Sequence, residues 1–239
     1  MADKHAVKIS GLGKEYSGRK ALDSVDLVVK RGELFGLLGP NGAGKTTMIK
    51  AMTGQLKPDK GSVRVMDVDA LRQPLKVRGV SGIVPEQESP PSFLSAEEYL
   101  HFVSRIRRIK SPEKHIEHWL EYLSFGGERD VLAKNLSRGT RQKLMIAQAF
   151  LHEPMIAFID EPLINLDPLM QKRVKEHLLK FVKGGGTVFL STHVLEIAEE
   201  ICSRVAIIDK GKIIHEGSVS EIKRKKKHLP EFFLSLVRD

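Results

Sequence analysis

Cysteine, tryptophan and tyrosine are scarce in this sequence, which has one, one and three of them among 239 residues. A disulfide framework within the chain is excluded, because Cys202 has no second cysteine to pair with. No apolar run approaches the ~20 residues that a membrane-spanning helix needs. The N-terminal segment MADKHAVKIS also lacks the apolar core of a signal peptide. We therefore expect a soluble intracellular protein.

The composition is otherwise that of a globular protein with a basic surplus. Hydrophobic residues make up 41% and charged residues 29%, which excludes disorder for most of the chain. Lys and Arg number 39 against 30 Asp and Glu, giving a net charge of +9. Seven of the basic residues, with two Glu, lie in residues 210–228. Such a surplus is typical of binding to nucleic acid, anionic lipid or a phosphorylated ligand, and also occurs with no specific partner.

The spacing of apolar residues predicts strands that alternate with helices. Strand-like segments cover residues 7–9, 25–29, 33–38, 63–65, 80–84, 155–159, 187–190 and 205–208, and helical periods cover 45–53, 169–182 and 195–201. This alternation favours a parallel sheet with helices on both faces. The sequence SVSE at 218–221 fits a capping box that opens a C-terminal helix.

The middle of the chain follows a different pattern. Helical periods cover residues 97–108, 112–124 and 140–152, and no strand pattern occurs from Pro90 to Glu153. We interpret this stretch as a helical subdomain inserted into the sheet-forming part of the chain.

A glycine-rich segment between a predicted strand and a predicted helix matches the pattern G-x-x-x-x-G-K-[ST]. Its residues are Gly39, Pro40, Asn41, Gly42, Ala43, Gly44, Lys45 and Thr46, followed by Thr47. The glycines let backbone N–H groups curve around phosphate oxygens at a helix N-terminus. We expect Lys45 to reach the β- and γ-phosphates of a nucleotide and the Thr46 hydroxyl to bind Mg²⁺. The alternative is a glycine-rich turn with a surface lysine.

The strand predicted over residues 155–159 is followed by two acids, Asp160 and Glu161. One interpretation is a buried strand that merely stops at charged residues. Because parallel strands end beside one another, a P-loop in the same sheet would place Asp160 near Thr46 and the metal. Glu161 lies one residue further out, where its carboxylate could polarise a water that attacks the γ-phosphate.

These motifs together resemble the ATP-binding subunit of ABC transporters, and the resemblance covers nearly the whole chain. The segment LSRGT at 136–140, followed by RQ, resembles the LSGGQ signature of that family. Asp167, after Leu166, resembles the aspartate of its D-loop, and Glu86-Gln87 fall at the position of its Q-loop.

The resemblance also assigns roles to two further side chains. Tyr16 stands where the family has an aromatic ring that stacks on adenine, although a tyrosine there could simply pack at a strand end. His193, after Ser191-Thr192, resembles the switch histidine that contacts the γ-phosphate. A histidine that caps a helix or lies in the core is the alternative for His193.

The resemblance implies a head-to-tail dimer with two ATP molecules at its interface. The resemblance implies that Ser137 and Gly139 contact the partner's nucleotide in trans. The residues alone show a second helix start that suits phosphate, and an ordinary Ser-Arg-Gly turn is the alternative. A separate multi-span permease is implied as a further partner, docked around residues 86–99. Phe93 and Leu94 suit such a contact, or ordinary core packing. Whether the dimer pairs identical or related subunits stays open.

Three departures from the family pattern affect these assignments. Arg138 and Thr140 replace a glycine and the glutamine of the signature, and Ile164 replaces a small serine before the D-loop aspartate. Glu86 stands at the expected Q-loop glutamine and Gln87 follows, so either could be the metal ligand. Arg138, the 163–168 region and the tail 230–237 are most similar to stand-alone exporter-type subunits, and an importer remains open.

The predicted fold is α/β, a P-loop NTPase parallel sheet core with an N-terminal antiparallel β part and an inserted α-helical subdomain. We expect one domain over 1–239, with a catalytic core at 1–88 and 154–217, a helical subdomain at 89–153 and a C-terminal helical tail at 218–239. The predicted function is an ATPase that uses ATP and Mg²⁺ to drive a permease.

Two other classes of function are compatible with a P-loop. One is a soluble ABC-family ATPase acting on nucleic acid or ribosomes, and the other is a small-molecule kinase. Such ATPases usually carry two nucleotide-binding halves or long coiled coils, and no specific nucleic acid partner is expected here.

The expected location is cytoplasmic, at the inner face of the membrane through the permease. The basic run Lys223, Arg224, Lys225, Lys226 and Lys227 is either a solvated face or a contact to anionic lipid.

Overall fold

The computed structural model describes residues 5–87, 89–224 and 228–237. Its N-terminal part is an antiparallel sheet of strand order β2-β1-β4-β5, built from β1 (His5–Tyr16), β2 (Arg19–Lys30), β4 (Lys60–Val65) and β5 (Val68–Asp69). Buried and exposed residues alternate along much of β2, so one face of this sheet is packed and the other faces solvent. The antiparallel β part expected at the N-terminus is therefore present.

A second sheet holds the centre of the molecule, with strand order β10-β9-β3-β8-β7-β6. Its strands are β3 (Leu34–Leu38), β6 (Ser81–Val84), β7 (Ile156–Asp160), β8 (Thr187–Thr192), β9 (Arg204–Asp209) and β10 (Lys212–Ser218). Neighbours from β9 to β6 are parallel, and β10 is antiparallel to β9. Strands β3, β7 and β8 are buried throughout, as expected for strands covered on both faces.

The described residues pack into two hydrophobic clusters, one on each face of the parallel sheet. Successive side chains of a strand point to opposite faces, so β3 contributes Leu34 and Leu38 to one cluster and Phe35 and Leu37 to the other. The first cluster includes α6 (Pro168–Lys183) and α7 (Leu195–Ile201), and the second includes α1 (Lys45–Met52) and the antiparallel sheet. The chain thus forms an α/β structure with its sheet buried between layers.

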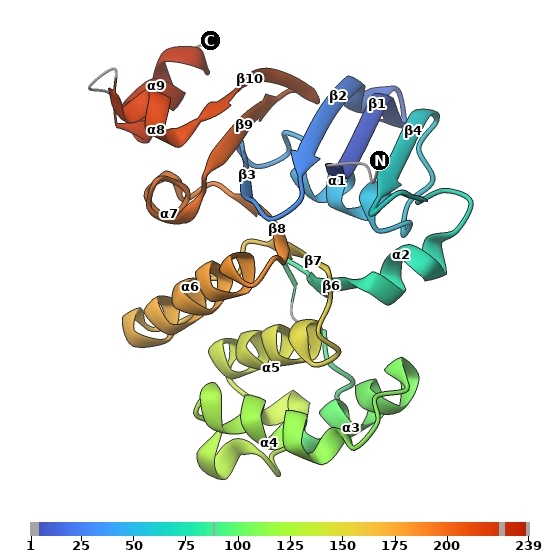
Figure 1. The fold of residues 1–239 in the computed structure, drawn as a ribbon, viewed down its shortest axis with the longest axis vertical. Helices are drawn as coiled ribbons and strands as arrows, with labels where there is room; N and C mark the ends of the chain where they lie inside the picture. The colour runs from blue at the N-terminus through green and yellow to red at the C-terminus, as the bar shows by residue number, and fades with distance from the viewer. Residues whose placement is uncertain (1–4, 88, 225–227, 238–239) are drawn as a thin grey trace.

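The helical insertion projects from the sheet edge that carries β6. It contains α3 (Ala96–Arg107), α4 (Pro112–Tyr122) and α5 (Arg138–Phe150), which lie together at the end of the molecule away from the antiparallel sheet (Figure 1). The short 3₁₀ turns Gly126–Glu128 and Ala133–Asn135 connect α4 to α5. Ser95 and Glu98 form a capping box that fixes the start of α3.

Several boundaries differ from those expected from the sequence. Residue 80 ends helix α2 (Pro74–Val80) instead of starting a strand, and Pro74 opens that helix at its first turn. Helix α5 begins at Arg138, two residues before the predicted start, because Ser137 caps it. Strand β10 was not predicted, since its short alternation resembles a loop.

The C-terminal segment contains α8 (Val219–Arg224) and α9 (Leu229–Leu236). Ser218, the first residue of the predicted capping box, is the last residue of β10, and its hydroxyl contacts that of Ser220 at 2.7 Å. Of the basic run, Lys225, Lys226 and Lys227 lie outside the described residues. A search of the described residues finds no helix with the length and apolar character needed to span a membrane.

Candidate functional site

The glycine-rich loop joins the carboxyl end of β3 to the N-terminus of α1, and its shape requires glycine. Gly42 and Gly44 have φ angles of 79° and 113°, in the region that disfavours other residues. A Cβ at Gly39 would stand 2.3 Å from the carbonyl oxygen of Ile208. Ala43 is buried, and its N–H donates to the Pro40 carbonyl at 3.2 Å. The loop therefore presents its backbone at the start of α1, as a phosphate-binding loop does.

A cavity of about 190 Å³ lies over this loop. It is lined by Ala21, Asn41, Gly42, Gly44, Lys45, Thr46, Thr47, Glu86, Asp160 and Glu161. Most of the residues predicted to bind phosphate and metal thus meet at one place, together with Ala21, which sequence reasoning missed. The sequence gives no signal for Ala21, because an alanine in a strand has no functional group to recognise.

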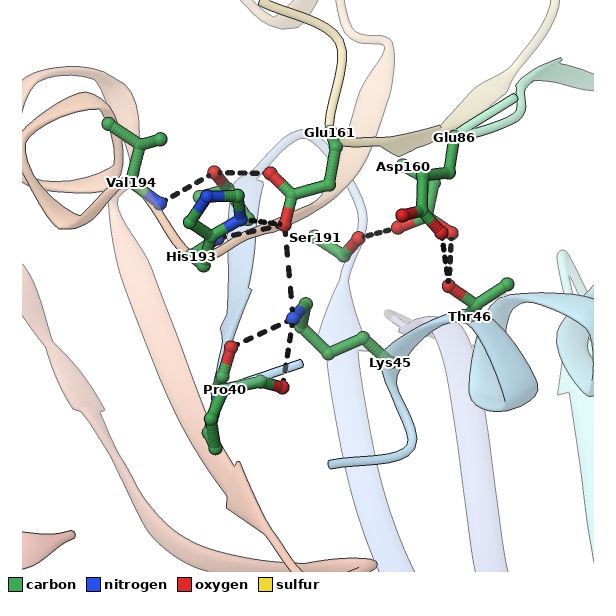
Figure 2. Close-up of polar contacts among 11 residues, drawn as sticks. Pro40, Lys45, Thr46, Glu86, Asp160, Glu161, Ser191, His193 and Val194 are labelled. Atoms are coloured by element: carbon green, nitrogen blue, oxygen red, sulfur yellow. Dashed lines mark hydrogen bonds and ion pairs between the residues drawn. The ribbon is translucent and has the colours of Figure 1, made fainter. Parts of the chain in front are cut away.

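Thr46 and Asp160 are in direct contact although 114 positions separate them in the sequence. The Thr46 hydroxyl donates to Oδ2 of Asp160 at 2.7 Å, and the Ser191 hydroxyl donates to Oδ1 (Figure 2). The register pairs Asp160 with Ser191 across β7 and β8, so the strand ends deliver both groups together. Ser191 was not predicted as a site residue, although its place at the end of an apolar strand was a usable signal.

Glu161 follows Asp160 in a left-handed backbone conformation, with φ of 51°. For a residue other than glycine such backbone strain costs about 1–3 kcal/mol, and strained residues cluster at functional sites. The conformation turns the carboxylate away from Asp160 toward Lys45 and His193 (Figure 2). Glu161 is 8% exposed, so its carboxylate is in contact with neighbouring protein groups more than with water.

Three groups surround the Glu161 carboxylate. Its Oε1 accepts from the His193 backbone N–H at 2.9 Å and lies 2.7 Å from His193 Nδ1, while Oε2 accepts from the Thr192 hydroxyl at 3.0 Å. Lys45 Nζ is 3.8 Å from Oε1 and donates to the carbonyls of Gly39 and Pro40 at 2.8 and 3.2 Å. The three residues predicted as catalytic, Lys45, Glu161 and His193, therefore form one connected network.

The structure separates the two Q-loop candidates for the metal site. Glu86 Oε2 is 3.5 Å from the Thr46 hydroxyl, and Glu86 lines the cavity over the P-loop. Gln87 does not line that cavity but lines a neighbouring one of about 340 Å³, which Glu86 also lines. Of the pair, Glu86 is the one whose carboxylate contacts Thr46.

Tyr16 is half exposed at the end of β1 and does not line the P-loop cavity. Lys14 Nζ lies 5.3 Å from the centre of its ring. Across the hairpin Tyr16 pairs with Arg19, whose guanidinium is 3.9 Å from the position of a Cβ at Gly42. The ring is therefore open to solvent beside Lys14 and outside the P-loop cavity, and its stacking on adenine stays a prediction.

The signature segment and the D-loop lie away from this cavity in the described chain, and none of their residues lines it. Ser137 caps α5 by accepting from Thr140 N–H at 3.0 Å, and Asp167 caps α6 by accepting from Met170 N–H at 2.9 Å. Thr140, in place of the family's glutamine, donates to Glu128 at 2.9 Å. The unusual Thr140 is thus a buried structural residue.

The oxygen donors at Thr46, Asp160 and Glu86 fit a magnesium ion. A hydroxyl and carboxylates are hard ligands of the kind that Mg²⁺ prefers. Among the described residues no group of three or more His, Cys, Asp or Glu could hold a metal by itself. Magnesium is commonly bound through one or two carboxylates, with nucleotide phosphates and water as its other ligands. This donor set is suited to that arrangement.

The fold and the glycine-rich loop are those of a P-loop nucleotide-binding protein with an inserted helical region. The family model described as ABC transporter matches residues 22–164. The chain therefore belongs to the ABC transporter family, as an ATP-binding subunit with ATPase activity. The predicted fold class and function are confirmed.

Two curated relatives illustrate the similarity. The chain is 36% identical over 221 residues to the daunorubicin/doxorubicin resistance ATP-binding protein DrrA of Streptomyces peucetius, covering 91% of this chain and 67% of DrrA. It is 33% identical over 224 residues to the ABC transporter ATP-binding protein MJ1023 of Methanocaldococcus jannaschii, covering 93% of this chain and 81% of that protein.

Two solved structures share the fold. The structure of an ATP binding subunit of an ABC transporter matches with a TM-score of 0.91 and 29% identity, covering 98% of this chain and 100% of the other. The ATP-binding cassette MJ0796, solved as a dimer in a post-hydrolysis state with ADP and Pi, matches with a TM-score of 0.83 and 25% identity, covering 89% and 98%.

Proposed function

We propose that this subunit binds ATP with Mg²⁺ in a head-to-tail dimer and uses hydrolysis to drive export through a separate permease. The observation that carries the proposal is the network in which Lys45, Glu161 and His193 meet above the P-loop. Lys45 would contact the β- and γ-phosphates once its ammonium exchanges the Gly39 and Pro40 carbonyls for phosphate oxygens. Tyr16 would stack on the adenine ring.

Glu161 would orient the attacking water, because its carboxylate is fixed by backbone and hydroxyl donors on one side and open to the cavity on the other. His193, whose side chain is 46% exposed, would contact the γ-phosphate from the end of β8. Thr46, Asp160 and Glu86 would hold Mg²⁺. When bound, the metal supplies positive charge that neutralises the phosphate oxygens.

The dimer would complete each site from the partner. Ser137 and Gly139 lie at the N-terminus of α5, where backbone N–H groups and the helix dipole favour phosphate. The dimeric MJ0796 cassette supports such a pairing by similarity. Asn165 packs against Gly139, and Asp167 follows Asn165 by two residues, so Asp167 would lie at the same interface. Identical subunits or two related ones both fit this arrangement.

The permease would dock around residues 86–99 of the insertion. Phe93 is 73% exposed there, whereas Leu94 packs partly against the core, so Phe93 is the better contact. Names such as daunorubicin/doxorubicin resistance protein among the relatives favour export. The expected location is the cytoplasmic face of a membrane. We also propose that the chain is a single domain. Its catalytic core covers 1–88 and 154–217, its helical subdomain covers 89–153 and its C-terminal helical tail covers 218–239.

The proposal includes contact of the basic run with anionic lipid. Lys223 Nζ donates to the Glu199 carbonyl at 3.0 Å, so part of its charge is engaged within the protein. Replacing the whole basic run by neutral residues should weaken binding to anionic vesicles at low salt. The run consists of Lys223, Arg224, Lys225, Lys226 and Lys227. Unchanged vesicle binding would remove the lipid contact from the proposal.

Co-purification and ATP turnover test the main proposal together. The subunit expressed with its native membrane fraction should be recovered with a multi-span membrane protein and should hydrolyse ATP. Recovery with RNA or DNA in a salt-sensitive manner, without a membrane protein, would instead favour the nucleic-acid ATPase.

A further inference from the structure

Two carboxylates converge on the single hydroxyl of Thr46. Its Oγ1 is 2.7 Å from Asp160 Oδ2 and 3.5 Å from Glu86 Oε2 (Figure 2). A hydroxyl has one hydrogen and can donate it to one acceptor at a time. The shorter distance gives that hydrogen to Asp160, so Glu86 approaches the site without a strong donor of its own.

Neither carboxylate has an ion-pair partner in the described chain, although Lys45 lines the same cavity. None of the ion pairs formed by the described residues includes Asp160 or Glu86, and Lys45 is directed to Glu161 and to two carbonyls. The other partner of Asp160 is the neutral hydroxyl of Ser191. The Thr46 end of the cavity therefore holds two carboxylates that have no ion-pair partner among the described residues.

The same three residues line two cavities. Thr46, Glu86 and Asp160 line both the cavity of about 190 Å³ over the P-loop and a second cavity of about 340 Å³. Since a water occupies about 30 Å³ of liquid volume, either cavity has room for a cation that keeps several waters.

We propose that Glu86 makes nucleotide binding conditional on a divalent cation. Its carboxylate repels the phosphates of a metal-free nucleotide and attracts the metal that accompanies them. A glutamine, which the family pattern has at this position, offers an amide oxygen without the charge. By linkage, the factor by which the metal strengthens nucleotide binding equals the factor by which the nucleotide strengthens metal binding. This inference rests on the proposed function.

The test is a binding measurement that does not depend on turnover. A non-hydrolysable ATP analogue is titrated into the wild-type protein and into Glu86→Gln, once with EDTA and once with Mg²⁺. The ratio of Kd in EDTA to Kd in Mg²⁺ should fall on the order of tenfold in Glu86→Gln, mostly through tighter binding in EDTA. Glu113→Gln makes the same charge change at an exposed position of α4 and should leave the ratio unchanged.

Glu86→Asp separates charge from side-chain length. It keeps the charge and should retain most of the wild-type ratio. A ratio that is equal in wild type and Glu86→Gln, or that falls equally in Glu86→Asp, would overturn the inference while leaving ATP binding intact. Absence of analogue binding in wild type under both conditions would instead contradict the proposed function.

Discussion

Gly139 lies directly against the carbonyl oxygen of Asn165: a Cβ added at Gly139 would stand 2.7 Å from that oxygen. Real Cβ contacts are essentially never so short, so the start of α5 and the loop before α6 fit together only with glycine. Gln142 strengthens the contact by donating to the Pro162 carbonyl at 3.0 Å. The signature segment and the D-loop are therefore packed directly against each other within a subunit.

Gly139→Ala should disturb both segments at once. We expect a loss of about 1–3 kcal/mol in the free energy of unfolding, because the added methyl group must displace backbone. ATP turnover should fall more than ATP binding to the isolated subunit, since the P-loop cavity is elsewhere. Urea unfolding and nucleotide binding measure the two effects.

Gly127→Ala is the matched control for that substitution, because nothing lies within 4 Å of a Cβ at Gly127. It should leave stability and turnover near wild type. Equal behaviour of the two variants would contradict the close fit between Gly139 and Asn165.

Lys45→Ala should abolish ATP turnover and weaken ATP binding, because the buried ammonium is the cation nearest to the P-loop carbonyls. Steady-state phosphate release and nucleotide titration measure both quantities. Lys114→Ala, at an exposed position of α4, provides the control. Wild-type hydrolysis in Lys45→Ala would remove the P-loop assignment.

Glu161→Gln should bind ATP yet turn over about 10²–10⁴ times more slowly, since an amide keeps the shape of the side chain but cannot act as a base. Its oxygen can still accept from Thr192 or His193. Size analysis should show a dimer that persists in ATP, whereas Glu113→Gln should behave as wild type. A variant that stays monomeric at high ATP and protein concentration would count against the head-to-tail dimer.

Two buried histidines make stability depend on pH. Burial, with a smaller effect of Arg107, lowers the pKa of His152 to about 4, and burial with His118 and Lys180 lowers the pKa of His177 to about 4. Both are therefore neutral in the folded protein at a pH where the unfolded chain, with histidine pKa values near 6.5, takes up protons. Their contribution to stability is present above about pH 6.5 and is lost as the pH falls toward 4.

His177→Phe should reduce this pH dependence. The His177 ring lies 4.8 Å from that of Trp119 and 4.6 Å from that of Phe150, and within the described chain its buried Nε2 has no hydrogen-bond partner. Phenylalanine suits that environment without taking up a proton. Urea unfolding at pH 7 and pH 5 should show a smaller loss for His177→Phe than for wild type. His228→Gln, at a side chain that is 79% exposed, should lose as much as wild type.

The sequence was sufficient for the features that are local. The P-loop and the strand ending at Asp160 depend on residues within a few positions of one another, and hydrophobic period and turn chemistry specify them. The helical insertion was also recognisable, because its helices have a period of their own. Helix α2 and strand β10 were not predicted, since their short segments carry little periodic signal.

Only the tertiary structure decided which distant groups share a site. Strand order places Ser191 beside Asp160 and Thr192 beside Glu161, a relationship that depends on sheet register and not on spacing along the chain. The tertiary structure also shows that Glu86 contacts Thr46 and that Gly139 packs against Asn165. The sequence determined the chemistry that is available, whereas packing between elements far apart in the chain determined which groups meet.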